Sequence, residues 1–400
     1  MNKRLSLKLI LIAFILMQLI MVSNDASAKE LSEMHSGITK LLNGVWGSSG
    51  SNVFAVGSDS TILYYDGNTW SNMNSGIPYV VLRDVWGSSG SDVFAVSLRG
   101  SFLLHYAGNS WTNMNIDSSL PGDSSLYGIW GSSGYDVFAV GGRQSTDSAG
   151  IILHYNGSTW SSMNTGTKKY LLILTDVWGS SGTDVFAVGS SGTILHYDGN
   201  SWSEMESTVT NNLWGVWGSS GSNVFAVGEG GIIIHYDGSN WSEIESGTSK
   251  WLNGIWGSSG TNVFAVGYSG TIFHYDGSTW SAVSSGTTED LYDVWGSSGS
   301  DVFAVGETIL HYDGNTWSEM SIEGSGCIVT YLLEDKPPQL NALRYLRDNV
   351  LNKTPAGQEI VRLYYEWSPV IVKAMQEDED FKEQMKEMID GVLGLIVGER

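Results

Sequence analysis

The chain has 400 residues and a formal net charge of −22, with 20 Lys and Arg against 42 Asp and Glu. This balance argues against nucleic acid or an anionic lipid surface as a partner, because phosphate binding needs a basic surface. Glycine is abundant (50 residues) and proline is scarce (6 residues), which is typical of many short strands joined by tight turns.

The N-terminus has the pattern of an export signal. Basic residues among the first eight precede an apolar run over 9–22, and Ala26-Ser27-Ala28 supplies the small residues of a cleavage site. The run is shorter than the ~20 residues that a membrane-spanning helix needs. We therefore predict a signal peptide over 1–28 and an exported protein (extracellular, cell-surface or periplasmic) with no transmembrane span in the mature chain. An uncleaved anchor is the alternative.

The middle of the chain consists of seven near-copies of a unit of about forty residues. Each unit contains Trp-Gly-Ser-Ser-Gly-x-(Asp/Asn)-Val-Phe-Ala-Val and ends in Tyr-(Asp/Asn/Ala)-Gly-x-x-Trp. The first phrase begins at Trp46, Trp86, Trp130, Trp178, Trp217, Trp256 and Trp295, and the second ends at Trp70, Trp111, Trp160, Trp202, Trp241, Trp280 and Trp317. Uninterrupted repeats of this length indicate a repeat architecture.

Each unit has the pattern of four strands. Within one unit the pattern predicts strands over 252–256, 262–267, 271–275 and around Trp280. Gly and Asp at the reversals supply the positive φ of hairpin turns, and the run Val-Phe-Ala-Val suits a sheet covered on both faces. We therefore predict an all-β fold, a seven-bladed β-propeller of four-stranded antiparallel blades over 29–322. A parallel β-helix is the competing fold, but its shorter coils lack paired hairpin turns.

The sequence offers two candidates for the outermost strand of the last blade. The segment 31–37 copies the fourth-strand ending 241–247 without its tryptophan, so it can lie against the last blade and latch the ring. Trp317 begins a strand that can fill the same place. The sequence leaves open which of the two closes the ring.

The repeat resembles known propeller families. Units of the form Val-Trp-Gly-Ser-Ser…Asp-Val-Phe-Ala-Val-Gly…Ile-Leu-His-Tyr-Asp-Gly-x-x-Trp resemble repeats of secreted bacterial propellers. The turn also resembles the Asp-box of sialidase-like propellers, Ser-x-Asp-x-Gly-x-Thr-Trp. Here Asp66 and Trp70 are one residue closer together, and His or Tyr replaces the serine. The resemblance implies a fold more than an activity.

Residues that recur in every unit are interpreted as structural. A histidine recurs in the third strand at His105, His154, His196, His235, His274 and His311, with Tyr64 in the first unit. Neighbouring sheets lie ~10 Å apart, whereas two imidazoles on one zinc each need a nitrogen within ~2 Å. We therefore expect no metal site and no cofactor, and histidines bonded to a local Asp, Asn or Ser.

The tryptophans and a second polar series follow the same logic. Each buried tryptophan hides ~150–250 Å², so the periodic tryptophans are expected to be packing anchors, although a lectin with one sugar per repeat would use them differently. An Asp or Asn follows each Ser-Gly-x, and we expect it to bond its own turn. Its positions are Asn52, Asp92, Asp136, Asp184, Asn223, Asn262 and Asp301.

Differences between the units point to one face of the ring. The first-to-second and third-to-fourth strand turns barely change, whereas the other connections vary in length, as in 115–128, 141–150 and 164–175. All basic residues of the repeats fall on this variable face: Lys40, Arg83, Arg99, Arg143, Lys168, Lys169 and Lys250. Varied loops on a constant scaffold carry function, so we expect the ligand here.

One position of the first strand is unrestricted. The strand reads Leu-x-(Gly/Asp)-(Val/Ile)-Trp, and x is Asn43, Arg83, Tyr127, Thr175, Trp214, Asn253 and Tyr292. These residues are expected at the mouth of the central channel, and with Arg143 they form the predicted ligand-binding set. Aromatic rings and amides suit a glycan, and a protein ligand is the second option. The alternative is a set of exposed positions under no constraint.

We expect a non-enzymatic binding or adhesion protein with no catalytic residues. A sialidase-like hydrolase would need convergent arginines, but Arg99 and Arg143 fall in outer loops. A glycosidase needs two carboxylates ~5–9.5 Å apart. Asp84, Asp176 and Asp293 precede the Val-Trp pair at sites that also accept Gly, which favours a turn role. A glycoside hydrolase and a pure scaffold for a cell-surface complex are the alternatives.

The repeats stop near 322, and 323–400 predicts a small helical region. Amphipathic patterns over 339–351, 357–367 and 381–397 predict three helices. Leu-Arg-x-x-Arg-Asp and Tyr-Tyr-x-x-Ser-Pro resemble the CFI-box C-terminal region of exported bacterial proteins. The resemblance implies a sorting module or cell-envelope anchoring, with Cys327 as its attachment or processing point. An inert free thiol is the alternative.

Overall fold

The computed structural model describes residues 40–98, 102–114, 116, 120, 124–143, 150–167, 172–320 and 383. Residues Thr39–Met320 form one compact unit. The predicted signal peptide, the segment 31–37, Cys327 and the three predicted C-terminal helices all lie outside the described residues, apart from the single position 383.

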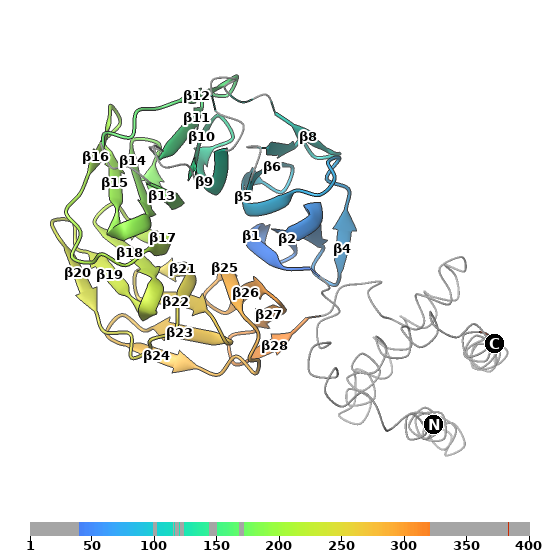
Figure 1. Ribbon diagram of the computed structural model, residues 1–400. Coiled ribbons are helices and arrows are strands. Elements are labelled where there is room, and N and C mark those ends of the chain that lie inside the picture. The colour runs from blue at the N-terminus through green and yellow to red at the C-terminus, as the bar shows by residue number, and fades with distance from the viewer. Residues whose placement is uncertain are drawn as a thin grey trace, which may run out of the picture. The chain divides into compact units, whose positions relative to one another are not determined.

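The described unit is a ring of seven four-stranded sheets, and each sheet is formed by four strands that are consecutive in the chain (Figure 1). Blade 1 is β1 (Leu42–Ser49), β2 (Asn52–Gly57), β3 (Ile62–Tyr65) and β4 (Trp70–Met73). Blade 2 is β5 (Val81–Ser89), β6 (Asp92–Leu98), β7 (Leu103–Tyr106) and β8 (Trp111–Asn113). Blade 3 is β9 (Ser124–Ser133), β10 (Asp136–Arg143), β11 (Ile151–Tyr155) and β12 (Trp160–Ser162). Blade 4 is β13 (Leu174–Ser181), β14 (Asp184–Gly189), β15 (Ile194–Tyr197) and β16 (Trp202–Glu204). Blade 5 is β17 (Leu213–Ser220), β18 (Asn223–Gly228), β19 (Ile233–Tyr236) and β20 (Trp241–Ile244). Blade 6 is β21 (Leu252–Ser259), β22 (Asn262–Gly267), β23 (Thr271–Tyr275) and β24 (Trp280–Val283). Blade 7 is β25 (Leu291–Ser298), β26 (Asp301–Gly306), β27 (Ile309–Tyr312) and β28 (Trp317–Glu319).

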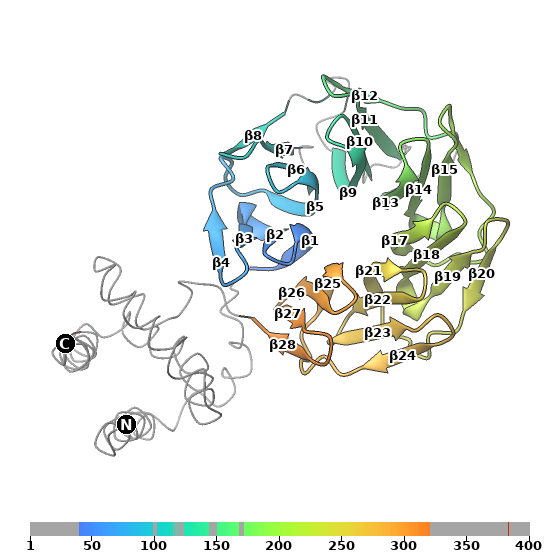
Figure 2. The same cartoon turned by 180° about the vertical axis from the view of Figure 1, so that it is seen from behind.

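The predicted seven-bladed propeller is confirmed. The strand pairings within the described blades are antiparallel, as in β1 with β2 and β2 with β3. The first strand of each blade lies innermost around the ring axis and the fourth lies at the rim, which is also visible from the opposite side (Figure 2). Because β28 pairs with β27, blade 7 has its fourth strand without any contribution from the N-terminal segment.

The hydrophobic core lies between the blades. In the run Val-Phe-Ala-Val of each second strand, alternate side chains point to opposite faces of the sheet. Phe54 and Val56 of blade 1 therefore pack with Val93 and Ala95 of blade 2, in a cluster that also includes Leu82. All five side chains are at most 1% exposed. Each blade is covered on both faces, which explains why the second strand is continuously apolar.

Both tryptophan series contact the neighbouring blade. Each opening tryptophan lies over the glycine that follows the equivalent tryptophan in the next blade, as Trp46 does over Gly87. A Cβ on any of these seven glycines would come within 2.6–2.7 Å of the indole. Each closing tryptophan instead meets the edge of a phenylalanine in the preceding blade, as Trp111 does with Phe54 at 6.2 Å between ring centroids. The expected role as packing anchors is confirmed.

Blade 7 closes onto blade 1 through the contacts used at the other junctions. Phe303 lies 5.6 Å from Tyr65 and 6.1 Å from Trp70, ring centroid to ring centroid. A Cβ on Gly47 would meet the indole of Trp295 at 2.7 Å. Among the described residues, the ring therefore closes by side-chain packing and not by an exchanged strand.

The two hairpins of a blade use glycine for different reasons. At the second hairpin the glycine after Asp, Asn or Ala has positive φ in every blade, for example +97° at Gly67, as predicted. At the first hairpin the glycine that ends Gly-Ser-Ser-Gly does not have positive φ, so the expectation is wrong there. It is needed for space, because a Cβ on Gly50 would lie 1.9 Å from the carboxylate of Asp301 in blade 7.

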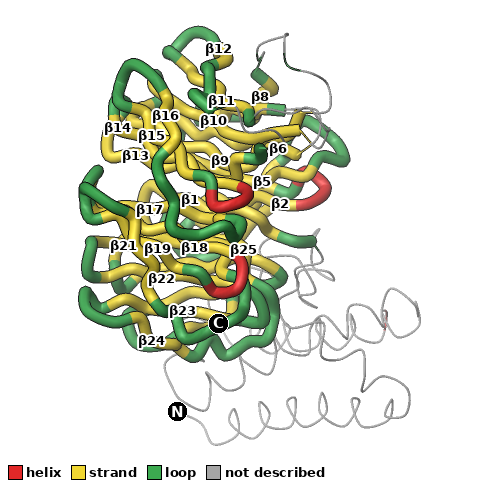
Figure 3. The backbone as a smooth tube through the Cα atoms, turned by 60° about the vertical axis from the view of Figure 1, so that its left-hand side comes forward, coloured by secondary structure: helices red, strands yellow, loops and turns green. Residues whose placement is uncertain are grey.

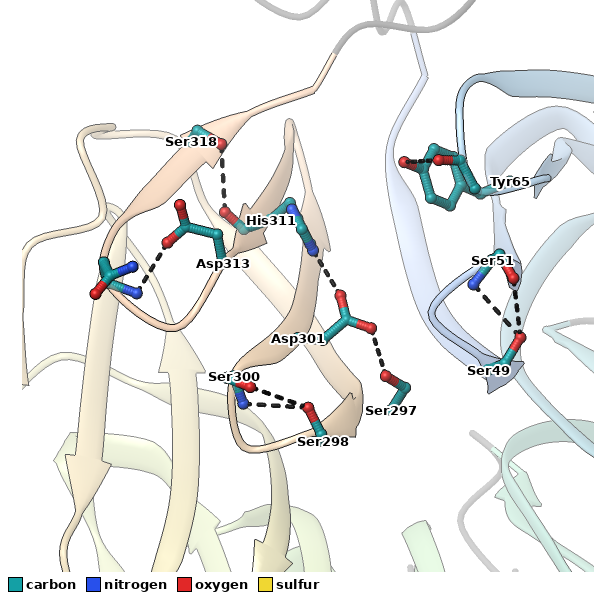
Figure 4. Close-up of polar contacts among 12 residues, drawn as sticks. Ser49, Ser51, Tyr65, Ser297, Ser298, Ser300, Asp301, His311, Asp313 and Ser318 are labelled. Carbon is teal, nitrogen blue, oxygen red and sulfur yellow. Dashed lines mark hydrogen bonds and ion pairs between the residues drawn. The ribbon is translucent and has the colours of Figure 1, made fainter.

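The recurring histidines are bonded within their own blades, as expected. His105 Nε2 lies 2.6 Å from Asp92 Oδ1, and Ser88 Oγ donates to the other oxygen of Asp92 at 2.5 Å. The equivalent set in blade 7 is His311, Asp301 and Ser297 (Figure 4). In these two blades the Asp thus bonds to a serine of its own hairpin and also joins the hairpin to the third strand.

Candidate functional site

The two faces of the ring differ in their loops and charges. Three connections between second and third strands contain a 3-10 turn, drawn red in Figure 3: η2 (Ser58–Ser60), η3 (Ser190–Gly192) and η4 (Glu229–Gly231). Lys40 pairs with Asp59 of η2 at 3.7 Å, and Lys250 Nζ donates to the carbonyl of Ser269 after β22 at 3.5 Å. Both described lysines therefore lie on the predicted variable face. Arg99, Lys168 and Lys169 lie outside the described residues, as do parts of the length-varying loops.

The unrestricted position x of the first strand is a β-bulge in all seven blades. In blade 1, Leu42 pairs with Gly57 and Gly44 pairs with Val56, so the ladder steps past Asn43. The same step occurs at the other six positions. A bulged residue is left out of the regular pairing, and its side chain is re-aimed relative to the strand. This geometry explains why x tolerates residues as different as Thr175 and Trp214.

Three of the seven x residues tie their blade to the next. Asn43 Nδ2 donates to the Leu82 carbonyl at 2.8 Å, and Asn253 Nδ2 donates to the Leu291 carbonyl at 2.8 Å. Thr175 Oγ1 lies 2.6 Å from the carbonyl of Leu213. Thr175 and Asn253 are buried. Their polar groups are occupied within the ring, so we leave these three residues out of the proposed binding site.

The carboxylates next to the bulges join the blades from within the first strands. Asp84 accepts a hydrogen bond from Val85 in its own strand and another from Ile129 in blade 3, at 2.7 and 2.8 Å. Asp176 bonds Val216 of blade 5 in the same way, and Asp293 bonds Val45 of blade 1. The predicted turn role is therefore wrong: because the bulge moves these residues inside the ladder, they bridge neighbouring blades.

Burial raises the pKa of all three carboxyl groups. Desolvation is the largest cause in each case. It raises the pKa of Asp84 to about 6 and that of Asp293 to about 8, against the downward effect of the backbone N–H donors. The pKa of Asp176 is also raised, and the charge of Asp84 adds to the effect of burial. Since both oxygens of each carboxylate accept backbone hydrogen bonds, the three groups are structural bridges.

Four aromatic rings line up across blades 5, 6 and 7 on the variable face. We call Trp214, Trp251, Tyr268 and Tyr292 the aromatic ledge. The centroids of Trp214 and Trp251 are 6.0 Å apart with 23° between the ring planes, and those of Trp251 and Tyr268 are 5.4 Å apart with 19°. Tyr292 meets Tyr268 edge-on, at 6.3 Å and 88°. The ledge is thus a run of near-parallel rings that ends in a right-angled corner.

The rings of the ledge reach solvent to different degrees. Trp251 is 37% exposed, whereas Trp214, Tyr268 and Tyr292 are half-buried. Trp251 precedes the first strand of blade 6, and Tyr268 follows its second strand, where its N–H donates to the carbonyl of Trp251 at 3.1 Å. The blade backbone therefore fixes the two central rings relative to each other.

The remaining predicted residues are placed as follows. Arg83 is half-buried, and its Nη1 donates to the carbonyl of Asn43 in blade 1 at 3.3 Å. Tyr127 is half-buried in β9, and Arg143 ends β10 opposite Ser124. The structure thus connects two predicted residues, Trp214 and Tyr292, through Trp251 and Tyr268, which were not predicted.

The sequence contains a signal for Trp251 and Tyr268, the two residues that were not predicted. Trp214 and Trp251 are the tryptophans of the repeat region that belong to neither periodic series. Aromatic residues outside a repeat pattern are not explained by the packing that every blade shares, so they are candidates for function. Tyr268 follows the same rule, since its equivalents in blades 1, 4, 5 and 7 are Ser58, Ser190, Glu229 and Glu307.

Two further features bear on chemistry. Within the ranges given above, no group of three or more His, Cys, Asp or Glu side chains is placed to hold a metal ion. The same part of the chain contains no helix of the length and apolar character needed to cross a membrane.

Comparison with known proteins shows a fold. No protein-family model and no curated protein sequence matches the chain. A solved structure described as YCF48 bound to D1 peptide aligns with a TM-score of 0.56 and 17% identity, over 70% of this chain and 95% of that one. YCF48 from Cyanidioschyzon merolae aligns with a TM-score of 0.53 and 14% identity, over 68% and 95%. The WD40 propeller domain of Doa1 gives 0.55 and 11%, over 67% and 90%. Identities this low establish the propeller architecture alone.

Proposed function

We propose that the chain is an exported, non-enzymatic binding protein that holds a segment of another protein, or a glycan, on the variable face of its propeller. The observation that carries the proposal is the aromatic ledge. It joins rings from three blades, lies outside the repeat pattern and contains the exposed ring of Trp251. Rigid aromatic rings supply contact area at a small entropic cost, and they are enriched where proteins bind ligands.

Two further observations support a binding role. The constant residues of the repeat are used in blade-to-blade packing, which leaves the variable face as the part of the surface that differs from blade to blade. A similar propeller, YCF48, is described in complex with a peptide. A ring of this architecture can therefore hold a peptide, and we propose that the aromatic ledge does so in this protein.

The export signal and the C-terminal region complete the proposal. The pattern of residues 1–28 supports secretion, and the resemblance of 323–400 to a CFI-box region supports sorting or anchoring, with Cys327 as its processing point. Adhesion at the cell surface would then combine an anchored C-terminus with a ligand-binding propeller. If the protein were a pure scaffold, its partners would bind other parts of the ring and would not need the aromatic ledge.

The test is binding by the full chain to a random-sequence peptide array and to a glycan array. Trp251→Ala and Trp214→Ala are compared with the wild type, and Tyr135→Ala is the matched control, because Tyr135 is a 76% exposed aromatic residue in a constant-face hairpin. We expect saturable binding that both ledge variants weaken and the control retains. Binding that ignores the ledge variants, or silence of the folded wild type on both arrays, would contradict the proposal.

A further inference from the structure

The charges around the aromatic ledge point to one class of ligand. We infer that the ledge takes the cationic side chain of a basic peptide, Lys or Arg, against its ring faces and beside fixed carboxylates. This inference rests on the proposed function, since it specifies which ligand the same site binds. It follows from three observations: the geometry of the rings, the signs of the charges beside them and the partners that those charges already have.

The rings offer the geometry that a cation needs. Cations bind over the face of Trp or Tyr within about 6 Å of the ring centroid. Tyr292 stands at 88° to Tyr268, so the corner presents the face of one ring beside the edge of the other. Trp251, with the exposed surface, extends the ledge from this corner toward Trp214. A long aliphatic side chain with a charged end can lie along such a surface.

Acidic groups dominate the charge at the corner. Burial and the charges of Asp290 and Glu307 raise the pKa of Tyr292 to about 12. The pKa of Tyr268 is also raised, chiefly by burial and by the charge of Asp290; Arg83 lowers it, and Glu229 adds a smaller upward effect. Both hydroxyl groups therefore lie in a region of negative potential, which attracts cations and repels anions.

The carboxylates of Asp290 and Glu229 are held in position, and each can still accept further hydrogen bonds. Ser269 N–H donates to Asp290 Oδ1 at 2.7 Å, and Asn212 Nδ2 donates to Glu229 Oε1 at 2.8 Å. The second oxygen of each carboxylate accepts no hydrogen bond from the described part of the chain. A fixed carboxylate with an open oxygen is a suitable partner for an ammonium or guanidinium group.

The two neighbouring basic residues do not neutralise these carboxylates. Arg83 donates to the carbonyl of Asn43, and Lys250 donates to the carbonyl of Ser269. Neither forms an ion pair with Asp290 or Glu229 among the described residues. The two carboxylates are therefore free to pair with a cation from a ligand, and the net charge of −22 favours its approach.

The experiment starts from peptides that the full chain selects on the random-sequence array. Each selected peptide is resynthesised with single Lys or Arg residues replaced by acetyl-lysine or citrulline, which removes the charge and leaves the protein untouched. Affinity is measured by titration of tryptophan fluorescence. We expect one neutral replacement to weaken binding roughly threefold to thirtyfold, and added salt to weaken it as well.

Protein variants locate the effect. Asp290→Asn keeps the oxygen that accepts the Ser269 N–H and removes the charge, so it should weaken basic peptides by a similar factor. Glu243→Gln is the matched control, because Glu243 is an exposed residue on β20 at the rim. Selected peptides without basic residues, or peptides that neutral replacement does not affect, would overturn the inference and leave the proposed function standing. Binding to glycans alone would also overturn it, whereas silence on both arrays would remove the proposed function itself.

Discussion

At the scale of single residues, the position after the bulge is Asp in some blades and Gly in the others, and this choice sets the contacts between neighbouring blades. Around the ring this position reads Gly44, Asp84, Gly128, Asp176, Gly215, Gly254 and Asp293. Each aspartate lies against a glycine of the preceding blade and bonds the backbone of the following one. The sequence showed the exchange of Asp for Gly, but only the geometry between blades explains it.

Replacing these glycines by alanine should have unequal effects. In Gly128→Ala the new Cβ lies 2.7 Å from the backbone Cα of Asp176, so either blade has to move. We expect a loss of about 1–3 kcal/mol in the free energy of unfolding. In Gly215→Ala the nearest atom is 3.1 Å away, and we expect a smaller loss.

Denaturant unfolding of the two variants measures the difference directly. The two positions are equivalent in the repeat and differ only in what the next blade places beside them. Equal losses would show that strand propensity, and not the contact with the next blade, decides the effect.

At the scale of strands, the sequence predicted pairing more successfully than side-chain direction. The four strands of a unit follow from local hydrophobic patterns and turn residues, which each blade contains in full. The bulge at x depends on the register between two strands, and no local pattern marks it. For this reason the sequence placed Asn43, Thr175 and Asn253 with Trp214 in one site, whereas the structure gives the first three to blade-to-blade hydrogen bonds.

The aromatic contacts between blades predict how strongly the ring is closed. Phe303 contacts Tyr65 and Trp70 across the seam between blades 7 and 1, and Phe225 makes the equivalent contacts with Tyr275 and Trp280 between blades 5 and 6. Phe303→Ala and Phe225→Ala should each cost about 3–5 kcal/mol, and the two costs should agree. Chemical denaturation of both variants is the measurement. A much smaller cost at Phe303 would show that the seam depends on other contacts.

At the scale of the whole propeller, three buried carboxyl groups link stability to pH. A carboxyl group whose pKa is raised by folding favours the folded state in its protonated form. Its contribution is fully present below the pKa of the unfolded chain, about 4. It is lost as the pH rises through the folded-state pKa, about 6 for Asp84 and about 8 for Asp293. The ring should therefore be less stable at alkaline pH.

The matching experiment compares melting temperatures across this range. We expect the Tm of the wild type to fall by several degrees from below pH 6 to above pH 8. Asp293→Asn, which resembles the protonated group, should show a smaller fall. Glu243→Gln, an exposed charge change, should follow the wild type. A wild-type Tm that rises over this range would contradict the assignment of raised pKa values to the inner carboxyl groups.

The alternation of Asp and Gly around the ring has a consequence that depends on whether the number of blades is odd or even. Two aspartates in adjacent blades would bring two buried carboxylates together and leave the second of them without a glycine in the preceding blade, which is unfavourable. A ring with an odd number of members cannot alternate throughout, so seven blades allow at most three aspartates and contain one Gly-Gly junction. That junction joins blades 5 and 6 through Gly215 and Gly254, and it carries the Trp214–Trp251 pair above it. The number of blades therefore singles out one junction of an otherwise repetitive ring, and the aromatic ledge begins there.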